Sequence, residues 1–110
     1  PIDEKEIEGL IGDIGMDDFK MLLAAFLSEC ASKLDSLARN SKVSDHELLE
    51  LDSHTLKSLS RTFGAVELGE ACAKLESAAK NKDPKYYLPL FEEIKRTSLS
   101  ATQALRDKYI

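Results

Sequence analysis

The strongest constraint on the fold is a stripe of apolar residues that recurs every three or four positions within residues 17–39. Its members are Phe19, Leu23, Phe26, Cys30, Leu34 and Leu37. This spacing places them on one face of an α-helix, and steps that alternate between four and three are typical of a helix packed in a bundle. The stripe therefore predicts one long bundle helix from about Asp17 to Arg39, with a length of roughly 35 Å.

The rest of the chain shows similar helical periodicity. Leu occurs 17 times and Ala 11 times, whereas Val occurs only twice. No segment alternates apolar and polar residues as a half-buried strand would. Helix-breaking residues separate further periodic segments at about 3–14, 44–63, 66–80 and 83–110. Short connections favour antiparallel neighbours, so we expect residues 1–110 to form a single all-α domain, an antiparallel up-and-down four-helix bundle with a short additional N-terminal helix.

Several residues mark the expected helix ends. Ser44 and Glu47 have the spacing of a capping box, which predicts that the third helix begins after Ser44. Gly64 suits the left-handed conformation at the end of that helix. Pro84 suits the first turn of the last helix, and Pro89 predicts either a kink in it or its proper start.

Charge and cysteine content narrow the function classes. The net charge of −5 argues against nucleic acid as a partner, because phosphate backbones select basic surfaces. No run approaches the roughly 18 apolar residues of a membrane span, so no membrane contact is expected. Cys30 and Cys72 lie in apolar helical stripes, and two cysteines are too few for a disulfide framework. We expect both to be reduced core residues of a cytoplasmic protein.

His54 is the residue that most nearly indicates a chemical function. On a helical wheel it lies roughly 150° from the apolar side of the third helix. That apolar side is set by Leu48, Leu56, Leu59 and Phe63. Lys57 and Ser58 share the face of His54, because positions i, i+3 and i+4 are neighbours. A surface histidine without a role remains the alternative. Asp52 falls among the apolar residues, where its carboxylate would need a cation or a hydroxyl as partner.

Few reactions fit the residues on this face. His46 and His54 are eight positions apart, roughly 12 Å along a helix, which is too far for them to share a metal ion. The sequence has no glycine-rich nucleotide loop and no marked acyl-transfer nucleophile. What remains is a single nucleophile that accepts a group activated elsewhere. A neutral imidazole suits this role because it has a free lone pair.

Three short segments resemble the signature of the histidine-containing phosphotransfer (HPt) domain family. They are His54-Thr55-Leu56-Lys57-Ser58, Gly64-Ala65 and Leu75-Glu76. The family pattern is His-x-Leu-Lys-Gly, followed by a glycine ten positions after the histidine and a Leu-Glu some twenty positions after it. The chain departs from the pattern at Ser58, where glycine is commonest, and at Asp52, where the family usually has an apolar or small residue.

The resemblance implies a role for each matching residue. His54 would be the phosphoacceptor, and Lys57 the cation that steadies the phosphoryl oxygens. Ser58 would be the small residue that lets a partner approach closely. Glu76 would be the polar residue on the neighbouring helix that lies near the histidine, although a solvated surface glutamate is an equal expectation. Arg61, one turn beyond Lys57, is expected to be an interface cation.

The resemblance also implies a phosphorelay function. His54 would accept a phosphoryl group from a receiver-domain aspartate and pass it to another. The chain would have no kinase activity and no cofactor of its own, because Mg²⁺ would lie in the receiver. The expected partners are response-regulator receiver domains and a hybrid sensor histidine kinase, and a monomer is expected. The domain could be a separate cytoplasmic protein or the cytoplasmic C-terminal domain of a membrane-bound kinase.

Two other functions remain open at this point. The chain could be the phosphoacceptor domain of a histidine kinase that receives its phosphate from ATP. It could also be a helical module that docks on receivers without being phosphorylated. The presence of both His54 and Lys57 argues against this second alternative, since a pure binder needs no nucleophile.

Overall fold

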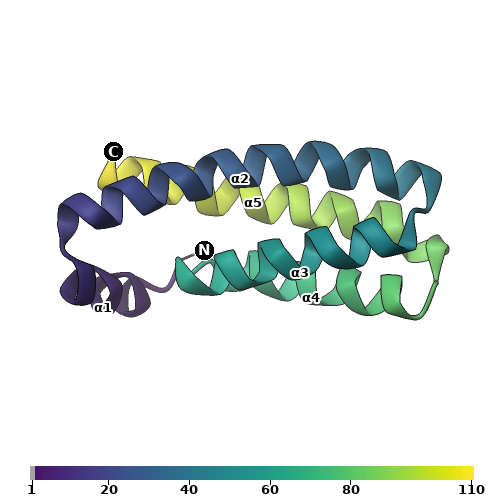
Figure 1. The fold of residues 1–110 in the computed structure, drawn as a ribbon, viewed down its shortest axis with the longest axis horizontal. Coiled ribbons are helices and arrows are strands. Elements are labelled where there is room, and N and C mark those ends of the chain that lie inside the picture. Colours follow the sequence, from purple (N-terminus) through teal and green to yellow (C-terminus); the bar gives the residue numbers. More distant parts are fainter. Residues whose placement is uncertain (1) are drawn as a thin grey trace.

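Four antiparallel helices run along the long axis of the molecule (Figure 1). They are α2 (Met16–Val43), α3 (His46–Thr62), α4 (Val66–Lys80) and α5 (Tyr87–Tyr109). The structure is a computed structural model that describes residues 2–110, with extents of 42 × 19 × 19 Å. Residues 2–110 contain no strand, and the predicted all-α bundle with a short N-terminal helix is confirmed.

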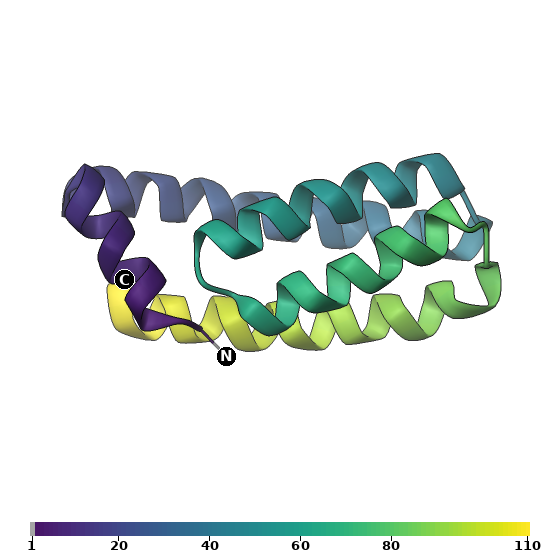
Figure 2. The same ribbon diagram turned by 90° about the horizontal axis from the view of Figure 1, so that it is seen from below.

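The short helix α1 (Glu4–Ile14) packs at one end of the bundle, beside the start of α2 and the end of α5 (Figure 2). A single 3₁₀ turn, Pro84–Tyr86, joins α4 to α5. Of the helices in the described part of the chain, none combines the length and the apolar character that crossing a bilayer requires.

The core is continuous along the bundle and is built from the predicted stripe of α2. Five of its six members are buried, and Leu34 is half-buried. Aromatic rings close the end near α1, where Phe26 stacks on Phe63 with 4.6 Å between ring centroids. Phe19 meets Tyr109 of α5 edge to face at 5.1 Å. The amphipathic pattern thus does fix which face of α2 is buried.

Cys30 and Cys72 are free thiols in this core, as expected. Burial raises the pKa of Cys30 to about 11 and that of Cys72 to about 12. Both thiols therefore stay protonated near neutral pH, and a protonated thiol is a poor nucleophile.

The predicted junction between the second and third helices is wrong in detail. Helix α2 runs to Val43, four residues beyond the expected end. Ser44 ends it by adopting a left-handed conformation with φ 54°, and its N–H bonds to the carbonyl of Asn40. The N-cap of α3 is Asp45, whose Oδ1 accepts a hydrogen bond of 3.1 Å from the N–H of Leu48. Either residue is a good cap by type, and the backbone turn at Ser44 decides between them.

The apolar side of α3 is also rotated slightly from the predicted one. Leu48 is 43% exposed, whereas Leu49 is fully buried. Buried Ser53 and Ser60 lie along the same side as Leu49 and Leu56. The wheel weighted only apolar residues, so it missed that small serines occupy part of the packed face.

The remaining helix ends follow only in part from the glycine and proline positions. The expected start of the last helix at Pro84 is wrong, because Pro84 lies in the separate 3₁₀ turn and α5 begins at Tyr87. Gly64 has φ 64° and forms the turn between α3 and α4. Its carbonyl accepts a hydrogen bond of 2.6 Å from the N–H of Asp3, which ties the start of α1 to this turn. Pro89 is the third residue of α5, where an N–H would have no partner within the helix, so Pro89 belongs to the first turn.

Candidate functional site

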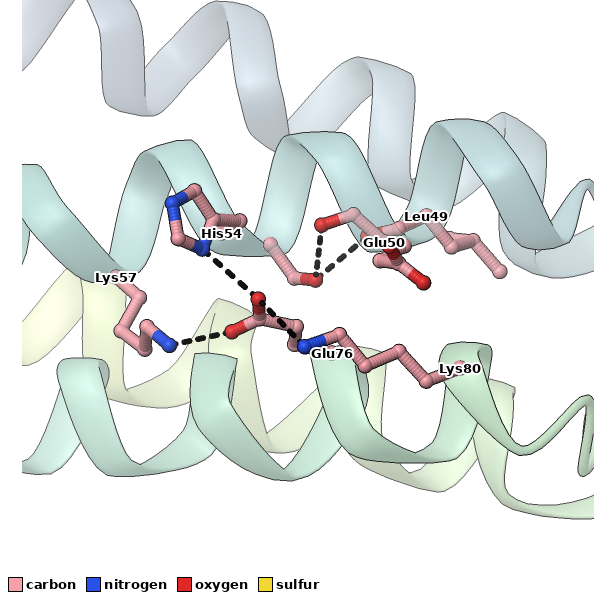
Figure 3. Close-up of polar contacts among 7 residues, drawn as sticks. Leu49, Glu50, His54, Lys57, Glu76 and Lys80 are labelled. Carbon is pink, nitrogen blue, oxygen red and sulfur yellow. Dashed lines mark hydrogen bonds and ion pairs between the residues drawn. The ribbon is translucent and has the colours of Figure 1, made fainter.

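The site is an exposed imidazole that a buried carboxylate of the neighbouring helix contacts from its inner side. The side chain of His54 is 59% exposed on the outer surface of α3, whereas that of Glu76 on α4 is only 8% exposed. Nδ1 of His54 lies 2.8 Å from Oε2 of Glu76. In Figure 3 the other ring nitrogen, Nε2, faces away from Glu76 and from α4.

Close packing of α3 on α4 brings these two residues together. Ser53 and Ser60 are fully buried small residues of α3, and each turns its hydroxyl back to a carbonyl of its own helix at 2.6 Å. Gly69 on α4 presents no side chain there, and a Cβ on it would lie 3.8 Å from the Cβ of Ser60. Such small residues allow two helices to approach closely, so the carboxylate of Glu76 reaches the ring of His54.

Glu76 is ionised at neutral pH despite its burial. Burial acts to raise the pKa of this carboxyl, but the hydrogen bonds and charges of Lys57 and His54 outweigh it and lower the pKa below the ordinary value of 4.5. Nζ of Lys57 lies 2.5 Å from Oε1, and the Lys57 side chain is itself only 18% exposed. Lys57 therefore neutralises Glu76 (Figure 3).

The carboxylate decides which ring nitrogen of His54 carries the proton. An ionised carboxylate can only accept hydrogen bonds, so Nδ1 of His54 must be the donor in this contact. The neutral ring then has its lone pair on Nε2, the nitrogen that faces outward. The arrangement presents an oriented nucleophile to an approaching molecule and places a negative charge behind the ring.

The structure brings together three of the five predicted site residues. Lys57 and Glu76 converge behind His54, which resolves the open choice for Glu76 in favour of a buried partner of the histidine. Ser58 and Arg61 are both exposed on α3, one and two turns beyond His54, and border the surface from which a partner could approach. The roles assigned to these residues remain predictions.

Asp52 has both kinds of partner that its position required. Asp52 is buried, with 5% of the residue exposed, and its carboxylate accepts a hydrogen bond of 2.5 Å from the hydroxyl of Ser36. It also lies 3.4 Å from Nζ of Lys33. Both partners belong to α2, so this carboxylate faces α2 and is not part of the His54–Glu76 group.

Sequence reasoning missed one residue of the site, Lys80. Its Nζ lies 3.8 Å from Oε2 of Glu76, four positions earlier on the same helix. That spacing is the signal that could have identified it, since residues i and i+4 are neighbours on a helix. Lys80 also borders a shallow depression next to the imidazole. The depression is lined by Glu47, Glu50, Leu51, His54, Glu76 and Lys80.

The second histidine is not part of this site. Nδ1 of His46 lies 2.6 Å from the hydroxyl of buried Tyr87, at the start of α5. Over residues 2–110, no three or more His, Cys, Asp or Glu side chains are grouped so that they could hold a metal ion.

An antiparallel four-helix bundle that presents one oriented histidine on a helix surface has the features of a histidine phosphotransfer domain. Comparison with known proteins gives the same result. The sequence matches the Hpt domain family over residues 21–107. The chain belongs to the Hpt domain family.

Individual relatives agree with this membership. The chain is 34% identical over 82 residues to the phosphorelay protein LuxU of Vibrio vulnificus strain YJ016, covering 74% of this chain and 71% of that protein. It is 33% identical over 79 residues to LuxU of Vibrio harveyi, covering 72% and 69%. The fold matches that of histidine-containing phosphotransfer protein B (HptB) from Pseudomonas aeruginosa PAO1, with a TM-score of 0.93, 23% identity and coverage of 98% of this chain and 93% of the other.

Proposed function

We propose that this chain is a phosphorelay phosphocarrier in which His54 accepts a phosphoryl group from a receiver-domain aspartate and passes it to another. The observation that carries the proposal is the 2.8 Å contact between Nδ1 of His54 and the buried carboxylate of Glu76. This contact leaves Nε2 as an exposed nucleophile. The relatives named as phosphorelay proteins support the same function.

In the proposed reaction, the lone pair on Nε2 attacks the phosphorus in line with the aspartyl oxygen. The P–N bond forms while the P–O bond breaks, and the departing aspartate keeps the electron pair as a carboxylate. The ring becomes positively charged as it reacts, and the Glu76 carboxylate behind Nδ1 stabilises that charge. Lys57 donates to the phosphoryl oxygens, so this chain contributes mainly positioning and charge.

The partners in this proposal are receiver domains and a hybrid sensor histidine kinase. The receiver would supply Mg²⁺, which neutralises charge on the phosphoryl group, and this chain would need no cofactor and no ATP-dependent kinase activity. One copy suffices, because His54, Lys57 and Glu76 come from the same chain. We place the domain in the cytoplasm, where thiols such as Cys30 and Cys72 stay reduced.

The test is to incubate the domain with Mg²⁺ and a receiver domain charged by acetyl phosphate. We expect phosphate on the domain that is labile in acid and stable in base, and that maps to His54 by mass spectrometry. His54→Gln should stay unlabelled, whereas the matched variant His46→Gln should label like the wild type. An unlabelled wild type, or equal labelling of His54→Gln, would contradict the proposal.

The same assay separates the two alternatives. A kinase phosphoacceptor domain would be labelled by a histidine kinase and ATP without any receiver. A docking module would bind the receiver and take up no phosphate from either source.

A further inference from the structure

Three groups converge on the carboxylate of Glu76, but only two of them are hydrogen-bonded to it. Nζ of Lys57 lies 2.5 Å from Oε1, and Nδ1 of His54 lies 2.8 Å from Oε2. Nζ of Lys80 lies 3.8 Å from Oε2, which is beyond hydrogen-bond distance (Figure 3). Lys80 thus forms a long ion pair with the carboxylate but does not donate a hydrogen bond to it.

Lys57 has two competing roles in the proposed reaction. In the free domain its ammonium neutralises Glu76. A phosphoryl group on His54 would bring up to about two negative charges and strong acceptor oxygens. Figure 3 shows that this group would be attached on the side of the ring that faces away from Glu76. If Lys57 turns toward those oxygens, the buried carboxylate keeps the charged ring of His54 at Oε2 but loses the ammonium at Oε1, and a buried carboxylate with less neutralisation is unfavourable.

We infer that Lys80 is the second counter-ion of Glu76, closing onto Oε2 when Lys57 turns to the phosphoryl group on His54. The inference rests on the proposed phosphocarrier function. Lys80 lies one turn from Glu76 on α4, and its side chain is 59% exposed, so it can rotate without disturbing the core. Lys80 acts through Glu76 and Lys57 and is therefore a positioning residue.

General attraction of an acidic receiver is the competing explanation for any effect of Lys80. The structure weakens it, because Glu47 and Glu50 line the same depression as Lys80. Their carboxylates offset the charge that Lys80 presents to an approaching partner, whereas Glu76 lies directly next to its ammonium.

The test compares the rates at which one phosphorylated receiver domain transfers its phosphoryl group to the wild type and to Lys80→Met. We expect Lys80→Met to slow transfer about twofold to fivefold, the range for a partly exposed ion pair. Lys80→Arg should restore the rate, because it keeps the charge. Lys74→Met is the matched control: Lys74 is on the same helix, is 58% exposed and pairs with Glu93 at 3.1 Å. It removes the same charge and should transfer at the wild-type rate.

A double-mutant cycle shows whether Lys80 affects the transfer rate through Glu76. In a Glu76→Gln background there is no carboxylate to neutralise, so adding Lys80→Met should change the rate no further. Attraction of the receiver would instead give the same slowing in both backgrounds, and that result would overturn the inference. A transfer rate of Lys80→Met equal to that of the wild type would also overturn the inference. In either case normal labelling of His54 in the parent protein would leave the phosphocarrier function standing.

Discussion

Nδ1 of His54 and Oε2 of Glu76 lie 2.8 Å apart, although the imidazole is 59% exposed and the carboxylate only 8%. The buried carboxylate of Glu76 thus holds the exposed imidazole of His54 in place. It fixes the ring and its tautomer from the inside while the whole outer edge stays open to a partner. In the proposed function the site is one half of an active centre, carried on two packed helices, and a second protein completes it by docking.

The first prediction concerns the charge behind the imidazole. Glu76→Gln keeps an acceptor oxygen of similar shape but removes the charge, so the positive charge that develops on His54 is less stabilised. A charge-assisted hydrogen bond exceeds a neutral one by about 1 kcal/mol, which corresponds to roughly fivefold slower phosphoryl transfer. Rapid-quench measurement of the rate of phosphoryl transfer from a phosphorylated receiver domain checks this. An unchanged rate would show that Glu76 only orients the ring.

The second prediction concerns acid stability. The pKa of Glu76 in the folded protein lies below the ordinary 4.5. The ionised group therefore stabilises the fold at pH values above 4.5, and this contribution is lost as the pH falls through the lower folded-state pKa. Urea unfolding should show that the free energy of unfolding of the wild type exceeds that of Glu76→Gln at neutral pH. This difference should shrink below pH 4.5. A difference that is constant across this range would be inconsistent with the assigned ion pairing.

The third prediction concerns the turn between α3 and α4. Gly64 has φ 64°, and a Cβ added to it would lie 2.6 Å from the backbone oxygen of Asp3. Gly64→Ala should therefore lower the free energy of unfolding by about 1–3 kcal/mol. The control is Gly9→Ala in α1, where a Cβ would meet nothing within 4 Å. That variant should gain roughly 0.5–1 kcal/mol from helix propensity. Equal effects on the two melting curves would refute the steric argument.

The outline of the fold could be predicted because it depends on local periodicity. The α2 stripe set the buried face of that helix, and residues such as Gly64 mark a helix end by their own backbone preference. The exposure of His54 followed from the same wheel. These features require only the few residues around each position.

The interior of the site could not be predicted from periodicity, because it depends on which helices touch. Glu76 is 22 residues from His54, and only the packing of α3 on α4 makes it a buried partner. The resemblance to the HPt family indicated proximity, but it did not show burial or the position of Lys80. Similarly, Ser44 and Asp45 are comparable caps by type, and the backbone turn alone selects Asp45.

The fourth prediction separates the second buried carboxylate, Asp52, from the proposed phosphotransfer site. Asp52→Ala leaves the hydroxyl of Ser36 without its acceptor and Lys33 without its counter-ion, which should lower the free energy of unfolding by about 2 kcal/mol. Asp52→Asn keeps an acceptor for Ser36 and should lower it by less. Because Asp52 faces α2, both variants should accept phosphate from a receiver within about twofold of the wild-type rate. Slower transfer in a folded variant would contradict this separation.

The last prediction concerns the junction of α3 and α5 at alkaline pH. Tyr87 is fully buried, and burial, followed by the charge of Asp83, raises its pKa above the ordinary 10.0. The neutral phenol therefore stabilises the folded state below pH 10.0, and this stability is lost as the pH rises through the higher folded-state pKa. Tyr87→Phe removes the 2.6 Å contact with His46 and should cost about 1 kcal/mol at neutral pH. It has no phenol to ionise, so the advantage of the wild type should narrow above pH 10.0 in chemical unfolding. Tyr86→Phe, at a side chain that is 49% exposed, should match the wild type throughout. If the advantage of the wild type over Tyr87→Phe stayed constant, the hydroxyl of Tyr87 would not be the buried group that the structure describes.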